Sequence, residues 1–210
     1  MSTPFDSIES ATAAMRNGSP VIVVDTDPNR ACGALVLAAQ HVTADLLRFF
    51  LREGRGYLSI PIDQSICLKF GLRPLEGTRP DGTTYTMSYN LVDRGSMGTT
   101  GQSTHDRALA IRAIVDPNTS PSQLRTPGFI HPVLTTREGV LDHATFPAAA
   151  TDLCRLAELE PAAVTIHILG DDGELARLEA LFDLAANREL KIVSLQRLVA
   201  YRSAHQQVMS

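Results

Sequence analysis

The sequence predicts one domain of the α/β or α+β class. Three observations carry this prediction. The length of 210 residues is that of a single domain. Short β-branched runs alternate with segments whose apolar residues recur at helical spacing. No repeat, low-complexity tract or linker interrupts this alternation. Because 44% of the residues are hydrophobic, the chain can bury a core without disulfides. We therefore expect residues 1–210 to form one domain.

The first quarter of the chain predicts a helix followed by two strands. Asp6 or Ser7 can cap the helix, and Gly18 can end it. The β-branched run at 21–24 is typical of a strand buried on both faces. A polar loop at 25–30 then leads to a small apolar strand at 33–39.

The middle of the chain is richer in glycine and proline and predicts shorter elements. Thr43 can cap a helix that extends to about residue 53. Pro61 restricts the strand expected at 57–62 to a sheet edge or a strand end. The remaining expected elements are a turn at 54–56, a short helix and loop within 67–83, a strand at 85–89, a glycine-rich segment at 94–103, a helix at 104–115 and a loop at 118–129.

The last third is the most regular part of the sequence. Apolar residues recur at helical spacing in 174–188, and β-branched residues dominate 164–169. The expected elements are helices at 147–159, 174–188 and 196–205 and strands at 164–169 and 192–195, with a turn at 170–173.

Composition excludes several function classes. A formal charge of −4 argues against nucleic-acid binding, which needs a basic surface. No apolar run approaches the ~20 residues of a membrane span, and the first ten residues lack the features of a signal peptide. Three widely spaced cysteines fit neither a disulfide framework nor a paired cysteine metal site. We expect a cytoplasmic protein with no membrane or nucleic-acid partner.

Several short motifs, taken in order, resemble those of one enzyme family. They are VIVVD at 21–25, GRG at 54–56, TTGQSTHDRA at 99–108, PG at 127–128, AATDLCRLA at 149–157, DDGELAR at 171–177, KIVS at 191–194 and YR at 201–202. The chain resembles 3,4-dihydroxy-2-butanone 4-phosphate synthase, which acts on ribulose 5-phosphate in riboflavin biosynthesis. The resemblance implies a compact α+β domain with a mixed sheet and flanking helices, and a homodimer.

The resemblance also implies a Mg²⁺ site, but the residues at its positions are different. Two glutamates of the family's acidic loop are replaced by Arg30 and Cys32. The family's metal histidine is replaced by Phe146, and the glutamate of the same motif by Ala148. Because a hard cation needs oxygen ligands, these replacements predict that the chain has lost the metal and uses no cofactor.

At other positions of the family's site, too, the residue differs from the one that the family has. The family's cysteine is Ser59, its histidine after Pro-Gly is Phe129, its phosphate-binding arginine is His143 and its late glutamate is His167. Neutral or cationic donors and phenyl rings thus replace carboxylates and a metal. Such a pocket suits a small anionic or planar metabolite.

We assign candidate roles by the chemistry of each side chain. Histidine is the natural acid or base near neutral pH, and cysteine can act as nucleophile or acid. The catalytic candidates are His143, His167, Cys32 and His131. The substrate-binding candidates are Arg30, Arg55, Ser59, Thr100, Gly101, Ser103, Asp106, Arg107, Phe129 and Phe146. Each also has a purely structural interpretation, such as a helix cap for Asp106 or a small buried apolar group for Cys32.

Three functions follow from this comparison. The leading hypothesis is a repurposed, metal-independent enzyme of isomerase, cyclase or lyase type in specialised metabolite biosynthesis. The alternative is a non-catalytic protein that binds a metabolite or a second copy of itself. The third is a genuine synthase that converts ribulose 5-phosphate.

Overall fold

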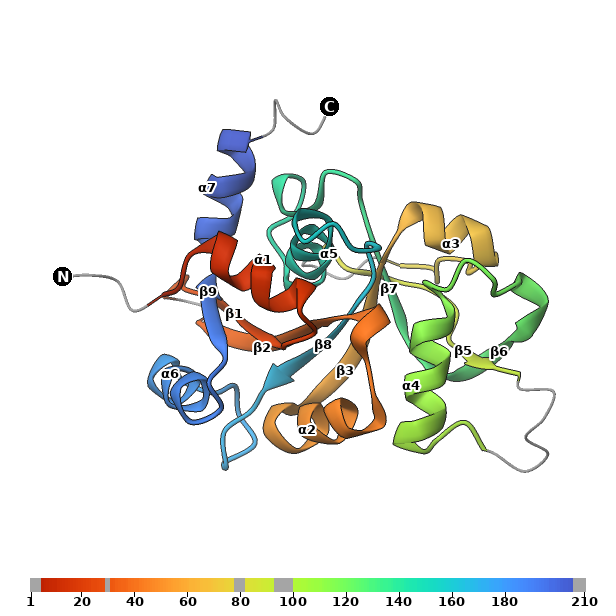
Figure 1. Ribbon diagram of the computed structural model, residues 1–210, viewed down its shortest axis with the longest axis horizontal. Helices are drawn as coiled ribbons and strands as arrows, with labels where there is room; N and C mark the ends of the chain where they lie inside the picture. The colour runs from red at the N-terminus through yellow and green to blue at the C-terminus, as the bar shows by residue number, and fades with distance from the viewer. Residues whose placement is uncertain (1–4, 29–30, 78–81, 93–99, 206–210) are drawn as a thin grey trace.

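A seven-stranded mixed sheet organises the computed structural model, which describes residues 5–28, 31–77, 82–92 and 100–205 (Figure 1). Its strands lie in the order β4-β7-β3-β8-β2-β1-β9, and the pairs β1–β9 and β3–β7 are parallel. The strands are β1 (Val21–Asp25), β2 (Cys32–Ala38), β3 (Arg55–Asp63), β4 (Thr84–Tyr85), β7 (Pro132–Thr135), β8 (Ala163–Ile168) and β9 (Lys191–Ser194). The predicted α+β class is confirmed.

A separate two-stranded sheet and the helices complete the fold. The small sheet pairs β5 (Tyr89–Leu91) with β6 (Leu124–Ile130). The helices are α1 (Ile8–Arg16), α2 (Ala44–Gly54), α3 (Gln64–Phe70), α4 (Thr104–Ala113), α5 (Phe146–Leu156), α6 (Leu178–Asn187) and α7 (Leu195–His205). Among the described residues, no helix is long and apolar enough to cross a membrane.

The main sheet is buried on both faces, and the alternation of its side chains divides the core into two clusters. In β1, Ile22 and Val24 pack with α2, α4 and α6, whereas Val21 and Val23 pack with α1, α5 and α7. This is the period of two that a strand imposes on its side chains. Figure 1 shows α1, α5 and α7 on one side of the sheet and α2 and α6 on the other.

The predicted helix starts are confirmed where a capping residue was identified. The side chains of Ser7 and Thr43 accept hydrogen bonds from backbone N–H groups in the first turns of α1 and α2. Each replaces a bond that the helix itself cannot make. The helix expected at 174–188 begins later, at Leu178, because residue 175 is held in a bridge to Leu169.

Two predictions about the middle strands are wrong. Pro61 does not restrict its strand to an edge, because β3 lies between β7 and β8. The proline is tolerated there because Pro61 itself has no partner in β8: the ladder's last pair is Ser59 with Thr165, and the next bridge joins Ile62 to Ala162. The expected turn at 54–56 is the direct junction of α2 and β3, where Arg55 takes a left-handed backbone conformation.

Local sequence also misplaced the strands between residues 84 and 135. The single strand expected at 85–89 is two strands, of which β4 joins the main sheet and β5 the small one. The loop expected at 118–129 contains β6, and β7 follows it. Neither strand has the local residue pattern of a strand, because proline and glycine interrupt it. β6 forms by pairing with β5, and β7 forms by pairing with β3.

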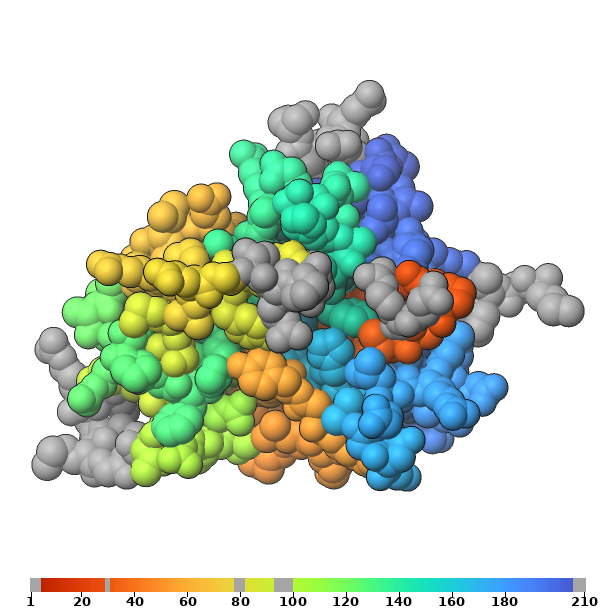
Figure 2. Space-filling model, turned by 180° about the vertical axis from the view of Figure 1, so that it is seen from behind, coloured from red at the N-terminus to blue at the C-terminus, as the bar shows by residue number. Residues whose placement is uncertain are grey.

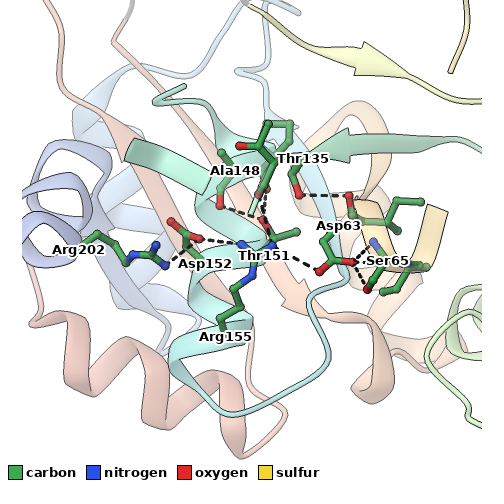
Figure 3. Close-up of polar contacts among 12 residues, drawn as sticks. Asp63, Ser65, Thr135, Ala148, Thr151, Asp152, Arg155 and Arg202 are labelled. Atoms are coloured by element: carbon green, nitrogen blue, oxygen red, sulfur yellow. Dashed lines mark hydrogen bonds and ion pairs between the residues drawn. The ribbon is translucent and has the colours of Figure 1, made fainter. Parts of the chain in front are cut away.

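A buried ionic network joins α5, α7 and the main sheet (Figure 3). The carboxylate of Asp152 is completely buried and accepts hydrogen bonds from Arg155 Nη1 at 2.9 Å and Arg202 Nη1 at 3.1 Å. Its second oxygen accepts the backbone N–H of Val140 at 3.0 Å. Arg155 also lies 3.6 Å from the carboxylate of Asp63, at the end of β3. The network therefore holds together elements that lie beside the cavity described below.

We expect Gly128→Ala to lower the free energy of unfolding by about 2–3 kcal/mol. A Cβ atom at this position would overlap the backbone of Tyr89 and Asn90 in the adjacent strand β5, and backbone cannot rotate away. Urea unfolding measures the change. The matched control is Gly170→Ala, where the nearest atom is the flexible end of Asp172 and the expected change is below about 1 kcal/mol. Equal effects of both substitutions would contradict the prediction.

Candidate active site

A cavity of about 880 Å³ opens on the face of the main sheet that packs against α5. Its floor is formed by side chains of β3 and β8. These side chains point to one face of the sheet, and the residues next to them in each strand point to the core on the other face. Ser59 and Thr165 face the cavity, and their hydroxyl oxygens lie 2.9 Å apart. Leu58 and Ile166, one position away, face the opposite core. Figure 2 shows orange, yellow, teal and blue segments, distant in the sequence, meeting in the middle of one face.

Five of the predicted site residues line this cavity: Cys32, Ser59, His131, Phe146 and His167. They come from β2, β3, the β6–β7 junction, α5 and β8, so only the folded chain brings them together. The ring of Phe146 meets that of His167 edge-on, with centroids 5.3 Å apart. The resemblance placed both at positions of the family's site, and the structure places both in one wall of the cavity.

His143 lies beside a second, smaller cavity of about 360 Å³. Thr83, Thr145 and Pro147 line both cavities, so the two are neighbours. The side chain of His143 is 57% exposed, and its Nε2 lies 3.8 Å from Asp142. His143 is therefore next to the main cavity rather than in its lining.

Two of the other candidates make contacts away from the main cavity. Arg55 is exposed and donates to Asp171 at 2.6 Å. Ser103 caps α4 by accepting the N–H of Asp106. Thr100, Gly101, Asp106 and Phe129 do not line the main cavity either. Arg30 lies outside the described residues. These residues stay predictions without a placement in the cavity.

Arg107 acts on the site at a distance, through its charge. Burial lowers the pKa of Arg107, and its Nε is buried without a hydrogen-bond partner among the described residues. The pKa of His131 is lowered, first by burial and second by the positive charge of Arg107. A pKa below 6.5 leaves the imidazole of His131 neutral near pH 7, so it can accept a proton.

The local sequence gave no indication of an aromatic wall beside His131. The ring of Tyr57 meets that of His131 at 5.8 Å and that of Tyr85 at 6.1 Å, both edge-on. Burial, followed by the neighbouring Tyr85, raises the pKa of Tyr57, so its hydroxyl stays protonated at neutral pH. Side chains alternate between the two faces of a strand, so Tyr57 and Ser59 of the predicted strand share a face. This alternation is the one sequence signal that could have identified Tyr57.

Sequence reasoning also missed Asp25, the one carboxylate among the described residues that line the main cavity. It ends β1 and is buried. Its Oδ1 accepts the backbone N–H of Asp27 at 3.0 Å and the side-chain N–H of Gln196 at 2.6 Å. An acidic residue directly after a buried strand was a usable signal, but the comparison with the family's acidic loop considered replaced positions such as Arg30 and Cys32, and Asp25 was not named as a candidate.

Comparison with known proteins gives one consistent family. The family model for 3,4-dihydroxy-2-butanone 4-phosphate synthase matches residues 9–201. The riboflavin biosynthesis protein RibBA of Cytophaga hutchinsonii is 40% identical over 207 residues, which cover 98% of this chain and 51% of that protein. RibBA of Aquifex aeolicus is 37% identical, over 94% of this chain and 49% of that protein. The chain thus spans about half the length of these relatives.

Solved structures agree with the sequence matches. A 3,4-dihydroxy-2-butanone 4-phosphate synthase in complex with two magnesium ions has a TM-score of 0.89 and 30% identity, covering 96% of this chain and 99% of that one. The synthase of Candida albicans has a TM-score of 0.85 and 32% identity, covering 94% and 97%.

These matches contradict the leading functional expectation. A repurposed, metal-independent isomerase, cyclase or lyase is not what a match over residues 9–201 supports, and the comparisons favour the synthase reading that we ranked third. For the same reason the low rank that we gave to the riboflavin reaction is wrong.

Proposed function

Because the chain belongs to the 3,4-dihydroxy-2-butanone 4-phosphate synthase family, we propose that it binds ribulose 5-phosphate in the main cavity. There it would convert the sugar phosphate to 3,4-dihydroxy-2-butanone 4-phosphate and formate. The observation that carries this proposal is the family match over residues 9–201. The cavity supports it, since ionisable side chains from separate strands, among them Asp25, Cys32 and His167, line it together with His131. Carbon, hydrogen and oxygen balance between substrate and products, so no oxidant is needed.

The side chains of the cavity provide the proton transfers that such a reaction needs. A neutral His131 would take a proton from a substrate carbon next to a carbonyl, which forms an enediolate. His167, which also lines the cavity, would return a proton to another atom of the same intermediate. The Ser59–Thr165 hydroxyl pair on the floor would orient substrate oxygens.

The family also implies Mg²⁺, and the described residues do not fit such a site. No group of three or more His, Cys, Asp or Glu side chains that could hold a metal ion occurs among them. In the lining of the cavity, Asp25 is the one described carboxylate, and its neighbours include a thiol and imidazoles. A hard cation such as Mg²⁺ needs several oxygen ligands. In this chain, proton transfer is therefore assigned to the side chains.

The cavity is larger than a five-carbon sugar phosphate needs, and part of its lining is aromatic. Its volume of about 880 Å³ is typical of sites that enclose larger ligands. The rings of Tyr57, Tyr85 and His131 would also accept a planar group. We keep a planar ligand, the homodimer and the cytoplasmic location as proposals.

Incubating the protein with ribulose 5-phosphate and Mg²⁺ tests the proposed function. We expect one formate to be released for each ribulose 5-phosphate consumed, measured by a coupled formate assay and by ³¹P NMR of the phosphate product. Asp142→Asn, an exposed change outside the main cavity, is the matched control and should keep the wild-type rate. No formate above the protein-free blank, with the substrate signal unchanged, would overturn the proposal.

A further inference from the structure

Gln196, which neither the sequence nor the comparisons single out, connects α7 to the one described carboxylate of the cavity. Its Nε2 donates to Asp25 Oδ1 at 2.6 Å. Its Oε1 accepts two hydrogen bonds from Thr26, from the backbone N–H at 3.2 Å and from Oγ1 at 2.8 Å. One amide group thus holds the last residue of β1 and the first residue after it.

The topology of the sheet explains why residues 171 positions apart meet here. Strands β1 and β9 are parallel neighbours, and Val24 is paired with Ser194. Their carboxyl ends therefore lie at the same end of the sheet. The chain leaves β1 as the loop after Asp25 and leaves β9 directly as α7. Gln196 lies in the first turn of that helix, beside the end of β1.

The contacts of Gln196 are not needed to start α7. Ser194, directly before that helix, accepts the N–H of Arg197 with its Oγ at 3.1 Å. Leu195, one residue before Gln196, lines the cavity and anchors the helix in the core. The exposed side chain of Gln196 is therefore available to act on Asp25.

We propose that Gln196 is a positioning residue that holds the Asp25 carboxylate in its orientation at the cavity. The inference rests on the proposed function, because it assigns Asp25 a place against the substrate. The amide N–H of Gln196 and the backbone N–H of Asp27 both point at Oδ1. Two donors on one oxygen restrict the rotation of the carboxylate about its side-chain bond. Without the side-chain donor, a reactive carboxylate rotates away from its productive geometry.

Two substitutions of Gln196 distinguish a role in positioning Asp25 from a role in supporting the loop. Gln196→Met keeps the length of the side chain and removes all its hydrogen bonds. Gln196→Glu keeps an acceptor for Thr26 but places a second carboxylate against Asp25. If Gln196 only supported the loop, the glutamate variant would be the milder change. If it positions Asp25, the glutamate variant is the more severe one, because like charges repel.

The experiment measures kcat and KM for ribulose 5-phosphate, and crystal structures of the variants. We expect kcat to fall about 10-fold in Gln196→Met and about 100-fold in Gln196→Glu, with KM changed less than about 3-fold, since the lost interaction acts on a reacting group. Ser203→Ala, on the exposed side of the same helix, is the control and should leave both constants unchanged.

Milder effects in the glutamate variant than in the methionine variant would overturn the inference. So would an Asp25 carboxylate that keeps its orientation in the crystal structure of Gln196→Met. That structural result is independent of turnover. If the wild-type protein releases no formate, the proposed function fails, and the orientation of Asp25 in Gln196→Met still decides whether Gln196 positions it.

Discussion

Replacing Asp152 by alanine is expected to lower the free energy of unfolding by about 3–5 kcal/mol, because it leaves buried cations without their partner. The carboxylate is completely buried and accepts hydrogen bonds from Arg155, Arg202 and the backbone of Val140. Its removal leaves the nearly buried guanidinium of Arg202 without its anion (Figure 3). Urea unfolding measures the loss, and the midpoint of thermal unfolding should fall by about 10 °C.

An exposed ion pair serves as the control for this result. Glu158 lies 3.5 Å from Arg16, with side chains 85% and 51% exposed, and Glu158→Gln should change stability by less than about 0.5 kcal/mol. Adding Arg202→Met to Asp152→Ala should recover part of the loss, because the unpaired buried charge is then gone. A loss below about 1 kcal/mol in Asp152→Ala would show that the network is not a support of the fold.

Replacing His131 by glutamine is expected to lower kcat/KM for ribulose 5-phosphate by about 10²–10⁴-fold, as for the loss of a general base. Glutamine retains the polar character and approximate size of the side chain but cannot accept and release a proton. His205→Gln is the control, because His205 is exposed at the end of α7 and hydrogen-bonds only within its own helix among the described contacts. Loss of activity smaller than about 10-fold would remove His131 from the proposed reaction.

The same residue predicts the pH dependence of the reaction. Burial and the charge of Arg107 lower the pKa of His131 below 6.5. A base is active when deprotonated, so kcat/KM should rise with pH up to that lowered pKa and stay level above it. Arg107→Gln removes the repulsive charge, so the pKa of His131 should rise and the acidic limb should move to higher pH. A limb that stays in place would show that Arg107 does not act on His131.

Local sequence predicted the last third of the chain better than the segment from 84 to 135. The regular last third was predicted closely, because helices such as α5 and strands such as β8 carry their own periodicity and caps. The segment from 84 to 135 was not, because β4 has two residues and β6 contains Pro127 and Gly128. Those strands form only by pairing with distant neighbours, so no window of local sequence contains the information.

The candidate site shows the same division. Cys32, His167 and Phe146 were assigned from the resemblance, and they do line one cavity. Asp25 and Tyr57 were missed, although Tyr57 begins a predicted strand and Asp25 directly follows one. The side that such a residue faces depends on the register of the sheet, and register is decided by the whole set of strands.

The sequence by itself determined the fold class, the capped helices and the buried strands, because these depend on residue types at short and regular spacing. It also determined which side chains occupy the family's positions. Only the tertiary structure decided that His131 lies within the electrostatic reach of Arg107, that Asp152 is buried between two arginines, and that Gln196 reaches Asp25. Charge, burial and hydrogen bonding depend on distance through space, and the packing of distant segments sets that distance.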